Sequence, residues 1–185
     1  MRRTPFHEHL KAKGAVFGEI AGWERANWYA NVEQKKDYVY SWKRQNWFDY
    51  SAAEHRAVRQ SVGLFDMSSF GKIKLMGRDA EEVLQLIAAN DVAVPVGKIV
   101  YTQFLNSEGH IEADVTITRL GPDEFLIVTP AATIRRDLHW INGHIPDTSH
   151  AIAVDISVSE SVFAVMGPDG AVNIVFRKEL SESSD

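Results

Sequence analysis

The clearest alternation of hydrophobic and polar residues lies within the stretch from Gly97 to Leu120. From Ile111 to Thr118 the odd-numbered positions are apolar and the even-numbered positions are polar, which predicts a half-buried strand. Residues 99–105 are rich in strand-forming side chains, and the sequence from Asn106 to Gly109 has the composition of a turn. The stretch therefore predicts a β-hairpin with an acid, Asp114, on its polar face.

Two registers of this hairpin are compatible with the turn. If Asn106 pairs with Gly109, apolar residues face apolar residues and Tyr101 lies directly opposite Asp114. We prefer this register because it matches core to core. A three-residue loop with a glycine bulge moves the pairing by one residue and places Thr102 opposite Asp114 instead. In the preferred register the residues that share the polar face are Tyr101, Gln103, Glu112 and Asp114.

The order of periodic segments between residues 72 and 157 predicts an α+β subdomain. It reads strand, helix, strand, strand, strand, helix, strand, and the connections are short. Such an order is typical of a ferredoxin-like antiparallel sheet with helices on one face, here with one extra hairpin strand. The expected elements besides the hairpin are strands at 72–76, 125–129 and 152–156, a helix starting after Gly77 and a helix at 132–142.

The N-terminal part predicts helices around an aromatic-rich insert. Thr4 and Pro5 have the signature of a helix start, with a helix from Pro5 to Lys13. A capping-box pattern at Ser51 starts another helix. Four of the five tryptophans lie between Gly22 and Tyr50 without a clear period, which predicts an ordered, irregular loop whose rings pack onto the body. Leu64 to Gly71 is interpreted as a connector.

We expect three parts in the chain. Residues 1–71 hold the N-terminal helices and the aromatic-rich insert of a first subdomain, residues 72–157 form the α+β subdomain, and residues 158–185 are a truncated return to the first subdomain. Within the last part the pattern predicts a strand at 162–166, a turn of glycines and proline, and a weak helix at 171–178.

Composition narrows the classes of function. The chain has 185 residues, of which 45% are hydrophobic and 24% charged, and its formal net charge is −5. The acidic balance argues against a nucleic-acid partner. The absence of cysteine excludes disulfides and thiolate chemistry and fits a cytoplasmic protein. No apolar run approaches the ~18 residues of a spanning helix, so no membrane partner is expected.

Motifs for metal, phosphate or nucleophilic chemistry are absent from the sequence. There is no glycine-rich phosphate loop and no nucleophile elbow. The seven histidines are scattered without the spacing of metal ligands, so no metal site is predicted. Three of them, His7, His9 and His55, are expected on polar helix faces.

Asp114 is the acid that most needs an explanation. Aspartate is depleted from strands because its short side chain competes with the backbone for hydrogen bonds. It is either a solvent-facing acid or a carboxylate that orients a cationic amine by proximity and charge. The pattern alone leaves both interpretations open. Two other acids have simpler interpretations, Asp91 as a helix end and Asp66 as a turn or cap residue.

Motifs spread in order over nearly the whole chain carry a family resemblance. They include Ala21 to Glu24, Val62 to Ser68, Asn90 with Asp91, Asn106 with Gly109, Ile111 with Asp114, and Met166 to Pro168. In these residues the chain resembles the N-terminal half of the glycine-cleavage aminomethyltransferase (T-protein) family. The insert between Trp28 and Trp47 is most similar to the branch fused behind the flavin domains of dimethylglycine and sarcosine dehydrogenases.

The resemblance implies a folate-binding aminomethyltransferase fold whose C-terminal barrel domain is absent from this chain. It also implies tetrahydrofolate as the acceptor of a one-carbon unit from an aminomethyl or methylamine donor of the N-methylglycine type. Asp114 takes the position of the family's carboxylate close to the reactive folate nitrogens, and Tyr101 that of a tyrosine lining the folate pocket. The family's preceding acid is Ala113 here, and its second glycine is His110.

The partners that the resemblance implies are folate, a small methylated amine, and a C-terminal half or a flavin-containing dehydrogenase domain. The chain by itself is expected to be incomplete as an enzyme. Two alternatives stay open. One is a noncatalytic regulatory or interaction module that retains the fold. The other is demethylation of a sulfonium or methoxy compound on the same scaffold.

Overall fold

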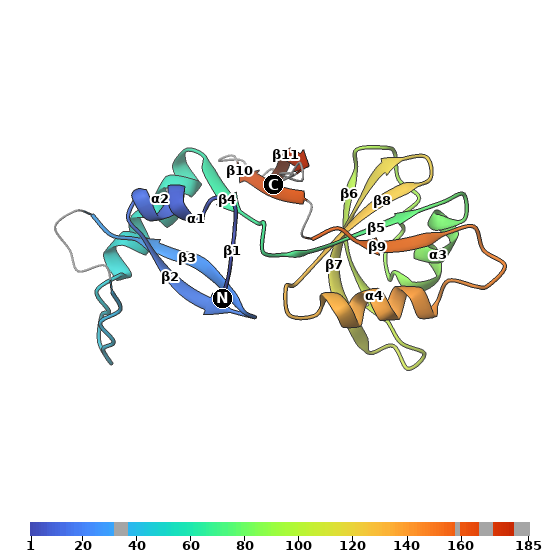
Figure 1. The fold of residues 1–185 in the computed structure, drawn as a ribbon, viewed down its shortest axis with the longest axis horizontal. Helices are drawn as coiled ribbons and strands as arrows, with labels where there is room; N and C mark the ends of the chain where they lie inside the picture. The colour runs from blue at the N-terminus through green and yellow to red at the C-terminus, as the bar shows by residue number, and fades with distance from the viewer. Residues whose placement is uncertain (32–36, 158–159, 167–171, 180–185) are drawn as a thin grey trace, which may run out of the picture. The chain divides into compact units, whose positions relative to one another are not determined.

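The computed structural model describes residues 1–31, 37–157, 160–166 and 172–179. The chain forms two compact units (Figure 1). The first unit comprises Met1–Ser69 and Glu160–Asp185, and the second comprises Phe70–Ser159. The predicted turn at 167–170 lies outside the described residues.

The second unit is a five-stranded antiparallel sheet in the order β6-β7-β8-β5-β9, with two helices. Its elements are β5 (Gly71–Met76), α3 (Ala80–Ile87), β6 (Ile99–Leu105), β7 (Ile111–Gly121), β8 (Glu124–Thr129), α4 (Ile134–Gly143) and β9 (Ile152–Asp155). This order of strands and helices confirms the α+β architecture that the sequence predicts.

Both helices pack on one face of this sheet. The buried residues of α3 join alternate residues of the strands in a single core. Leu84 and Ile141 from the helices and Ile73, Val115 and Ile127 from the strands are each no more than 2% exposed. Burial of one such side chain stabilises the fold by roughly 1.5–3 kcal/mol. The strand residues that alternate with this core therefore project from the opposite face, which α3 and α4 do not cover (Figure 1).

The first unit contains two three-stranded sheets, in the orders β1-β3-β2 and β11-β10-β4. Its elements are β1 (Arg2–Arg3), α1 (His7–Ala12), β2 (Ala15–Ile20), β3 (Trp23–Tyr29), α2 (Phe48–Gln60), β4 (Gly63–Asp66), β10 (Glu160–Met166) and β11 (Val172–Glu179). Trp28 is buried against Val16 and Ala30, and the rings of Trp47 and Tyr50 pack on this cluster. The expected packing of aromatic rings onto the body is confirmed for these residues.

Three predictions for the first unit are wrong, for one physical reason. Trp23–Tyr29 is a strand and not a loop because it pairs with β2. Gly63–Asp66 is a strand and not a connector because it pairs with β10, which lies far along the chain. Val172–Glu179 is a strand and not a helix because β10 pairs with it. In each case hydrogen bonding between segments decides the structure, and local composition does not report it.

The predicted start of the first helix is also wrong. The helix begins at His7, and Thr4 does not cap it with its side chain. The Thr4 hydroxyl instead donates to Asp66 Oδ2 at 2.5 Å and so ties the N-terminal segment to β4. The following helix begins at Phe48, before the predicted start at Ser51.

His7 lies in the interior and not on a polar helix face as predicted. It is 5% exposed, its ring stacks on Phe17 with centroids 4.1 Å apart, and its Nε2 lies 2.6 Å from Glu24 Oε2. Burial opposes ionisation of Glu24, but hydrogen bonding from His7 and the charge of Arg3 lower the pKa of that carboxyl. The imidazole thus links α1 to β3.

Two glycines of the second unit differ in how closely other backbone atoms approach them. Gly77 and Gly97 both have positive φ, at 124° and 88°. A Cβ on Gly77 would lie 1.9 Å from the carbonyl oxygen of His150, whereas a Cβ on Gly97 would meet nothing within 4 Å. Gly97→Ala should therefore cost only the conformational strain, about 1–2 kcal/mol. Gly77→Ala should cost at least about 1 kcal/mol more, because the backbone at His150 must also move.

Urea unfolding of the two alanine variants measures this difference. The circular dichroism midpoint should fall further for Gly77→Ala than for Gly97→Ala. Equal losses of unfolding free energy would contradict the close approach of Gly77 to His150.

Candidate functional site

The β6–β7 hairpin forms, in a register that differs from both predicted ones. Gln103 pairs with Asp114, and Tyr101 pairs with Thr116. The preferred prediction, with Tyr101 opposite Asp114, is therefore wrong, as is the alternative that pairs Thr102 with Asp114. The pairing slips by two residues relative to the preferred register, and an even slip leaves every side chain on its predicted face. Tyr101 and Asp114 remain on the same helix-free face.

The slip follows from the conformation of the turn. Asn106 N donates to His110 O at 3.0 Å, so the loop contains three residues, with Gly109 at a φ of 81°. The Asn106 side chain holds this loop, because its Oδ1 accepts hydrogen bonds from the backbone N–H groups of Glu108 and His110. The three-residue loop moves the pairing by one residue, and a bulge between Phe104 and Leu105 moves it by one more. The composition of the turn does not predict that bulge.

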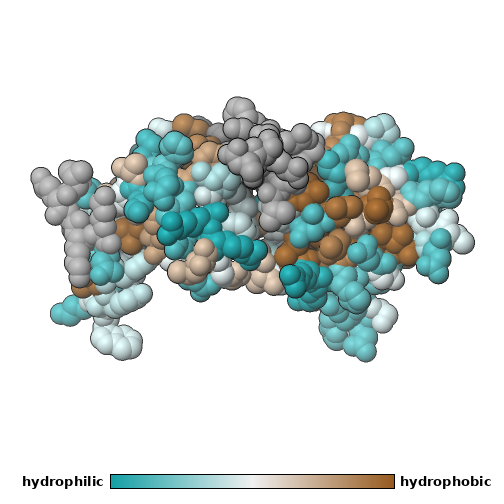
Figure 2. Space-filling model, in the orientation of Figure 1, coloured by the Kyte–Doolittle hydropathy of each residue, from teal (hydrophilic) through white to brown (hydrophobic). Residues whose placement is uncertain are grey.

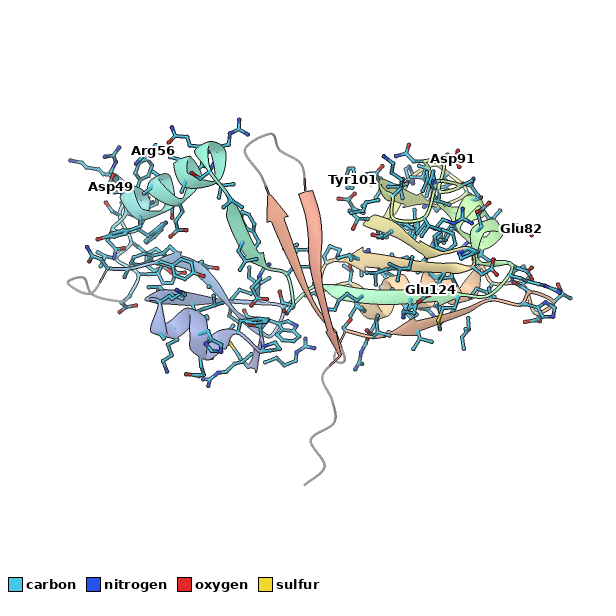
Figure 3. The ribbon with its side chains drawn as sticks, turned by 90° about the horizontal axis from the view of Figure 1, so that it is seen from above. Asp49, Arg56, Glu82, Asp91, Tyr101 and Glu124 are labelled. Carbon is cyan, nitrogen blue, oxygen red and sulfur yellow. The ribbon has the colours of Figure 1, made fainter. Side chains whose placement is uncertain are left out.

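Asp114 lies in the middle of β7 with its carboxylate exposed. Gln103 Nε2 donates to Asp114 Oδ1 at 2.9 Å across the strand pair. Tyr101 is the diagonal neighbour, is 60% exposed, and projects outward from β6 (Figure 3). Its hydroxyl hydrogen-bonds to Asp114, and this bond, then burial, then the negative charge of Asp114, raise the pKa of Tyr101. The structure thus brings the two sequence-predicted site residues together with a third, Gln103.

The segment after α3 supports the outer edge of this hairpin. Ala89 N donates to Gln103 O at 2.9 Å, and Asn90 Nδ2 donates to Tyr101 O at 2.7 Å. These bonds occupy backbone groups that an edge strand would otherwise expose.

Asp91 follows the end of α3, where hydrogen bonds from Ala93 N and the Gln85 side chain lower its pKa. Asp91 is therefore engaged in its own turn, on the same unit as Tyr101 (Figure 3).

Hydrophobic side chains also reach the surface of the second unit. Figure 2 shows that they interrupt the hydrophilic surface over β5 and β9. On β9, Ile152 is 58% and Val154 is 39% exposed. The register aligns Val154 with Lys74 of β5, so these side chains project from the same face as Tyr101 and Asp114. That face therefore combines aromatic, apolar and acidic side chains.

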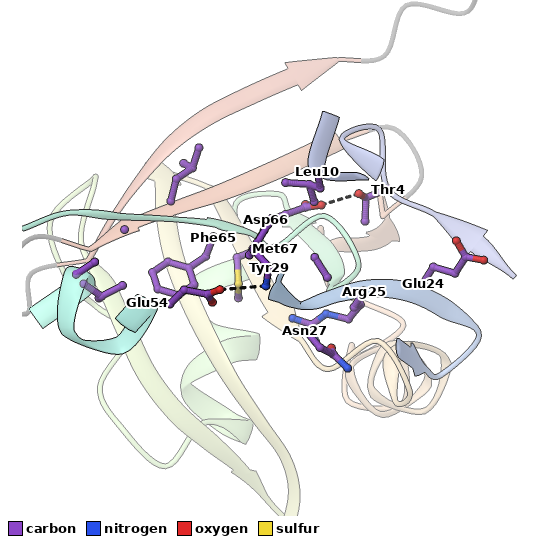
Figure 4. A pocket seen from close by; sticks show the side chains of 15 residues that line it. Thr4, Leu10, Glu24, Arg25, Asn27, Tyr29, Glu54, Phe65, Asp66 and Met67 are labelled. Atoms are coloured by element: carbon purple, nitrogen blue, oxygen red, sulfur yellow. Dashed lines mark hydrogen bonds between the residues drawn. The ribbon is translucent and has the colours of Figure 1, made fainter. Parts of the chain in front are cut away.

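A cavity of about 390 Å³ lies in the first unit, apart from this hairpin (Figure 4). Its carboxylates have partners within the protein: Glu54 Oε1 accepts from Tyr29 N at 3.1 Å, and Asp66 accepts from Thr4 and from Ser68 N. Burial raises the pKa of Glu54. Asp66 is thus the last residue of β4, and its predicted turn role is limited to its side chain, which accepts from Ser68 N in the turn that follows. The residues that line this cavity do not include Tyr101 or Asp114, the two site residues that the sequence predicts.

Within residues 1–31, 37–157, 160–166 and 172–179, no three His, Asp or Glu side chains are arranged to hold a metal ion. Among these same residues no helix has the length and apolar character to cross a membrane.

Gln103 is the site residue to which the sequence assigns no role. Alternation places it on the polar face, but its position directly opposite Asp114 appears only in the observed register. The sequence does contain an amide, Gln103, on the strand that pairs with the strand of Asp114. That the two residues are cross-strand partners follows only from the correct turn and bulge.

Comparison with known proteins points to one family. The GCVT N-terminal domain matches residues 6–178. The 4-methylaminobutanoate oxidase (formaldehyde-forming) of Paenarthrobacter nicotinovorans is 46% identical over 168 residues, which cover 91% of this chain and 20% of that protein. The mitochondrial dimethylglycine dehydrogenase of Mus musculus is 35% identical over 140 residues, which cover 76% of this chain and 16% of that protein. The chain therefore spans a fifth or less of these two relatives.

A solved structure has the same fold. The glycine cleavage system aminomethyltransferase T from Bartonella henselae superposes with a TM-score of 0.72 at 24% sequence identity. The match covers 90% of this chain and 41% of that one. It confirms the aminomethyltransferase fold predicted from the sequence.

The contact between Tyr101 and Asp114 is testable without any ligand. Because the carboxylate disfavours the phenolate, Asp114→Asn should lower the pKa of Tyr101 toward the ordinary tyrosine value of about 10. Ultraviolet titration of tyrosine ionisation measures this, with Tyr101→Phe identifying the contribution of Tyr101. Glu112→Gln is the matched control, since Glu112 is on the same face but bonds to Asn106. An unchanged titration in Asp114→Asn would show that the two side chains do not interact.

Proposed function

The chain belongs to the GCVT N-terminal domain family, and from this membership we propose that it is a tetrahydrofolate-binding domain for one-carbon transfer. The observation that carries the proposal is the exposed Tyr101 ring beside the Asp114 carboxylate on the helix-free face of a rigid sheet. The resemblance of the sequence assigns these same two positions to the folate pocket.

The residues of this face fit the chemistry of a reduced folate. A pteridine ring is flat and carries N–H donors, so it needs an aromatic or apolar surface and a hydrogen-bond acceptor. Tyr101 supplies the ring. Asp114 supplies the acceptor, and its Oδ1 is already oriented by Gln103. Tetrahydrofolate itself supplies the nucleophilic nitrogens that accept the one-carbon unit.

Asp114 would act by charge. Amine donors are cations near neutral pH, and positive charge also develops where the one-carbon unit leaves the amine. A carboxylate beside such a charge favours it, by up to roughly 1 kcal/mol while the pair stays exposed to water and by more once a ligand excludes water. Because the carboxylate is fixed on a strand between buried neighbours, little reorganisation is needed when that charge appears. Neither binding nor stabilisation of charge requires Asp114 to exchange a proton.

We propose small N-methylated amines of the N-methylglycine type as donors. The names of the two relatives above specify methylamino and dimethylamino acids, which supports this class. A flavin-containing dehydrogenase domain would be the partner that releases the one-carbon unit by oxidation. The domain described here would then hold the folate acceptor.

Calorimetric titration with 5-formyltetrahydrofolate, a stable reduced folate, tests the site. The chain should bind it, and Asp114→Ala should weaken binding at least about tenfold, because a charged hydrogen bond is lost. Tyr101→Ala should weaken it by a similar factor through loss of stacking. Glu112→Gln should bind like the unchanged protein.

Two results would count against the proposal. Equal affinity in Asp114→Ala would remove Asp114 from the site. No affinity in the unchanged chain would favour a noncatalytic regulatory or interaction module that retains the fold.

A further inference from the structure

The pair formed by Gln103 and Asp114 is built more firmly than an ordinary surface hydrogen bond. The two residues lie directly opposite each other on β6 and β7. Ala113 and Val115, which flank Asp114, are each 2% exposed, so the backbone under the carboxylate is fixed by the core. The backbone under Gln103 is fixed as well, because its carbonyl accepts from Ala89 N at 2.9 Å. Only the side-chain torsions remain free, and the 2.9 Å bond between the side chains restrains them.

The Asp114 carboxylate determines the orientation of the Gln103 side-chain amide. An ionised carboxylate only accepts hydrogen bonds, so the amide must present its NH₂ group to Asp114 and direct its Oε1 elsewhere. The bond occupies Oδ1 of Asp114. Oδ2 then has a defined direction on the exposed face, and because a carboxylate oxygen has two lone pairs it can accept from a ligand as well as from the Tyr101 hydroxyl.

Gln103 also contacts the third member of the cluster. Hydrogen bonding from its side chain acts on the pKa of Tyr101 in the opposite direction to Asp114, lowering it. An amide N–H that approaches the phenolic oxygen has this effect, because it stabilises the phenolate. Gln103 is therefore next to Tyr101 on the same face of β6 and directly opposite Asp114.

We propose that Gln103 is a positioning residue for Asp114, holding the carboxylate in the one rotamer in which Oδ2 faces the bound folate and amine. This inference rests on the proposed function. Gln103 acts through Asp114 and does not itself contact the ligand. Its removal should therefore weaken binding only where Asp114 is present.

A double-mutant cycle measures this dependence. Gln103→Leu keeps the size of the side chain and removes the amide, and it should weaken binding of 5-formyltetrahydrofolate by about 3–10-fold. In the Asp114→Ala background the same change should have no further effect. Gln103→Glu should weaken binding more than Gln103→Leu, because a second carboxylate repels Asp114 and displaces it. Circular dichroism establishes that each variant is folded, and Glu112→Gln is again the control.

A second readout needs no folate. Because the amide lowers the pKa of Tyr101, Gln103→Leu should raise that pKa above its value in the unchanged protein, in the opposite direction to Asp114→Asn. If the unchanged chain does not bind folate, the proposed function fails, and the titration of Tyr101 alone decides whether Gln103 organises the cluster.

If the chain binds folate and its affinity depends on Asp114, two results overturn the role of Gln103. One is unchanged affinity in Gln103→Leu, and the other is a full additive loss in the Asp114→Ala background, which would mean direct contact with the ligand.

Discussion

Burial of every second residue of β7 is the constraint on which the site depends. Ala113, Val115 and Ile117 are each no more than 2% exposed in the core beneath α3 and α4. Asp114 between them must therefore project from the opposite face. A slip of the pairing by one residue would bury this carboxylate without a partner and expose its apolar neighbours, which costs several kcal/mol. The position of the acid is thus secured by the packing of residues that never meet the ligand.

The turn and the segment along the edge of the sheet fix the positions of Tyr101, Gln103 and Asp114 on that face. Asn106 holds a three-residue loop through bonds from its own side chain, and the loop with its adjoining bulge sets Gln103 opposite Asp114. Asn90 and its neighbours bond to the outer edge of β6 and hold the backbone of Tyr101. Three side chains from two adjacent strands therefore meet on a framework with little freedom. Such preorganisation is what electrostatic catalysis and oriented binding require.

The sequence predicts what local patterns encode, and it misses what distant pairing decides. Alternation assigned Asp114 and Tyr101 to one face correctly, because an error of two residues in register does not change the face. It could not identify Gln103 as the cross-strand partner, since the bulge at Phe104 has no local signature. Gly63–Asp66 and Val172–Glu179 are strands only because both pair with β10. His7 has the sequence context of a polar helix, and only the fold brings Glu24 and Phe17 to it.

We propose that a reduced folate binds against the β6–β7 hairpin on the face that carries Asp114. The most direct measurement is an amide NMR titration of the isotope-labelled chain with 5-formyltetrahydrofolate. We expect the largest shifts at Tyr101, Gln103 and Asp114 and at the adjoining edge around Asn90. Shifts centred on the first-unit cavity at Tyr29 and Glu54, or no shifts at saturating folate, would contradict it.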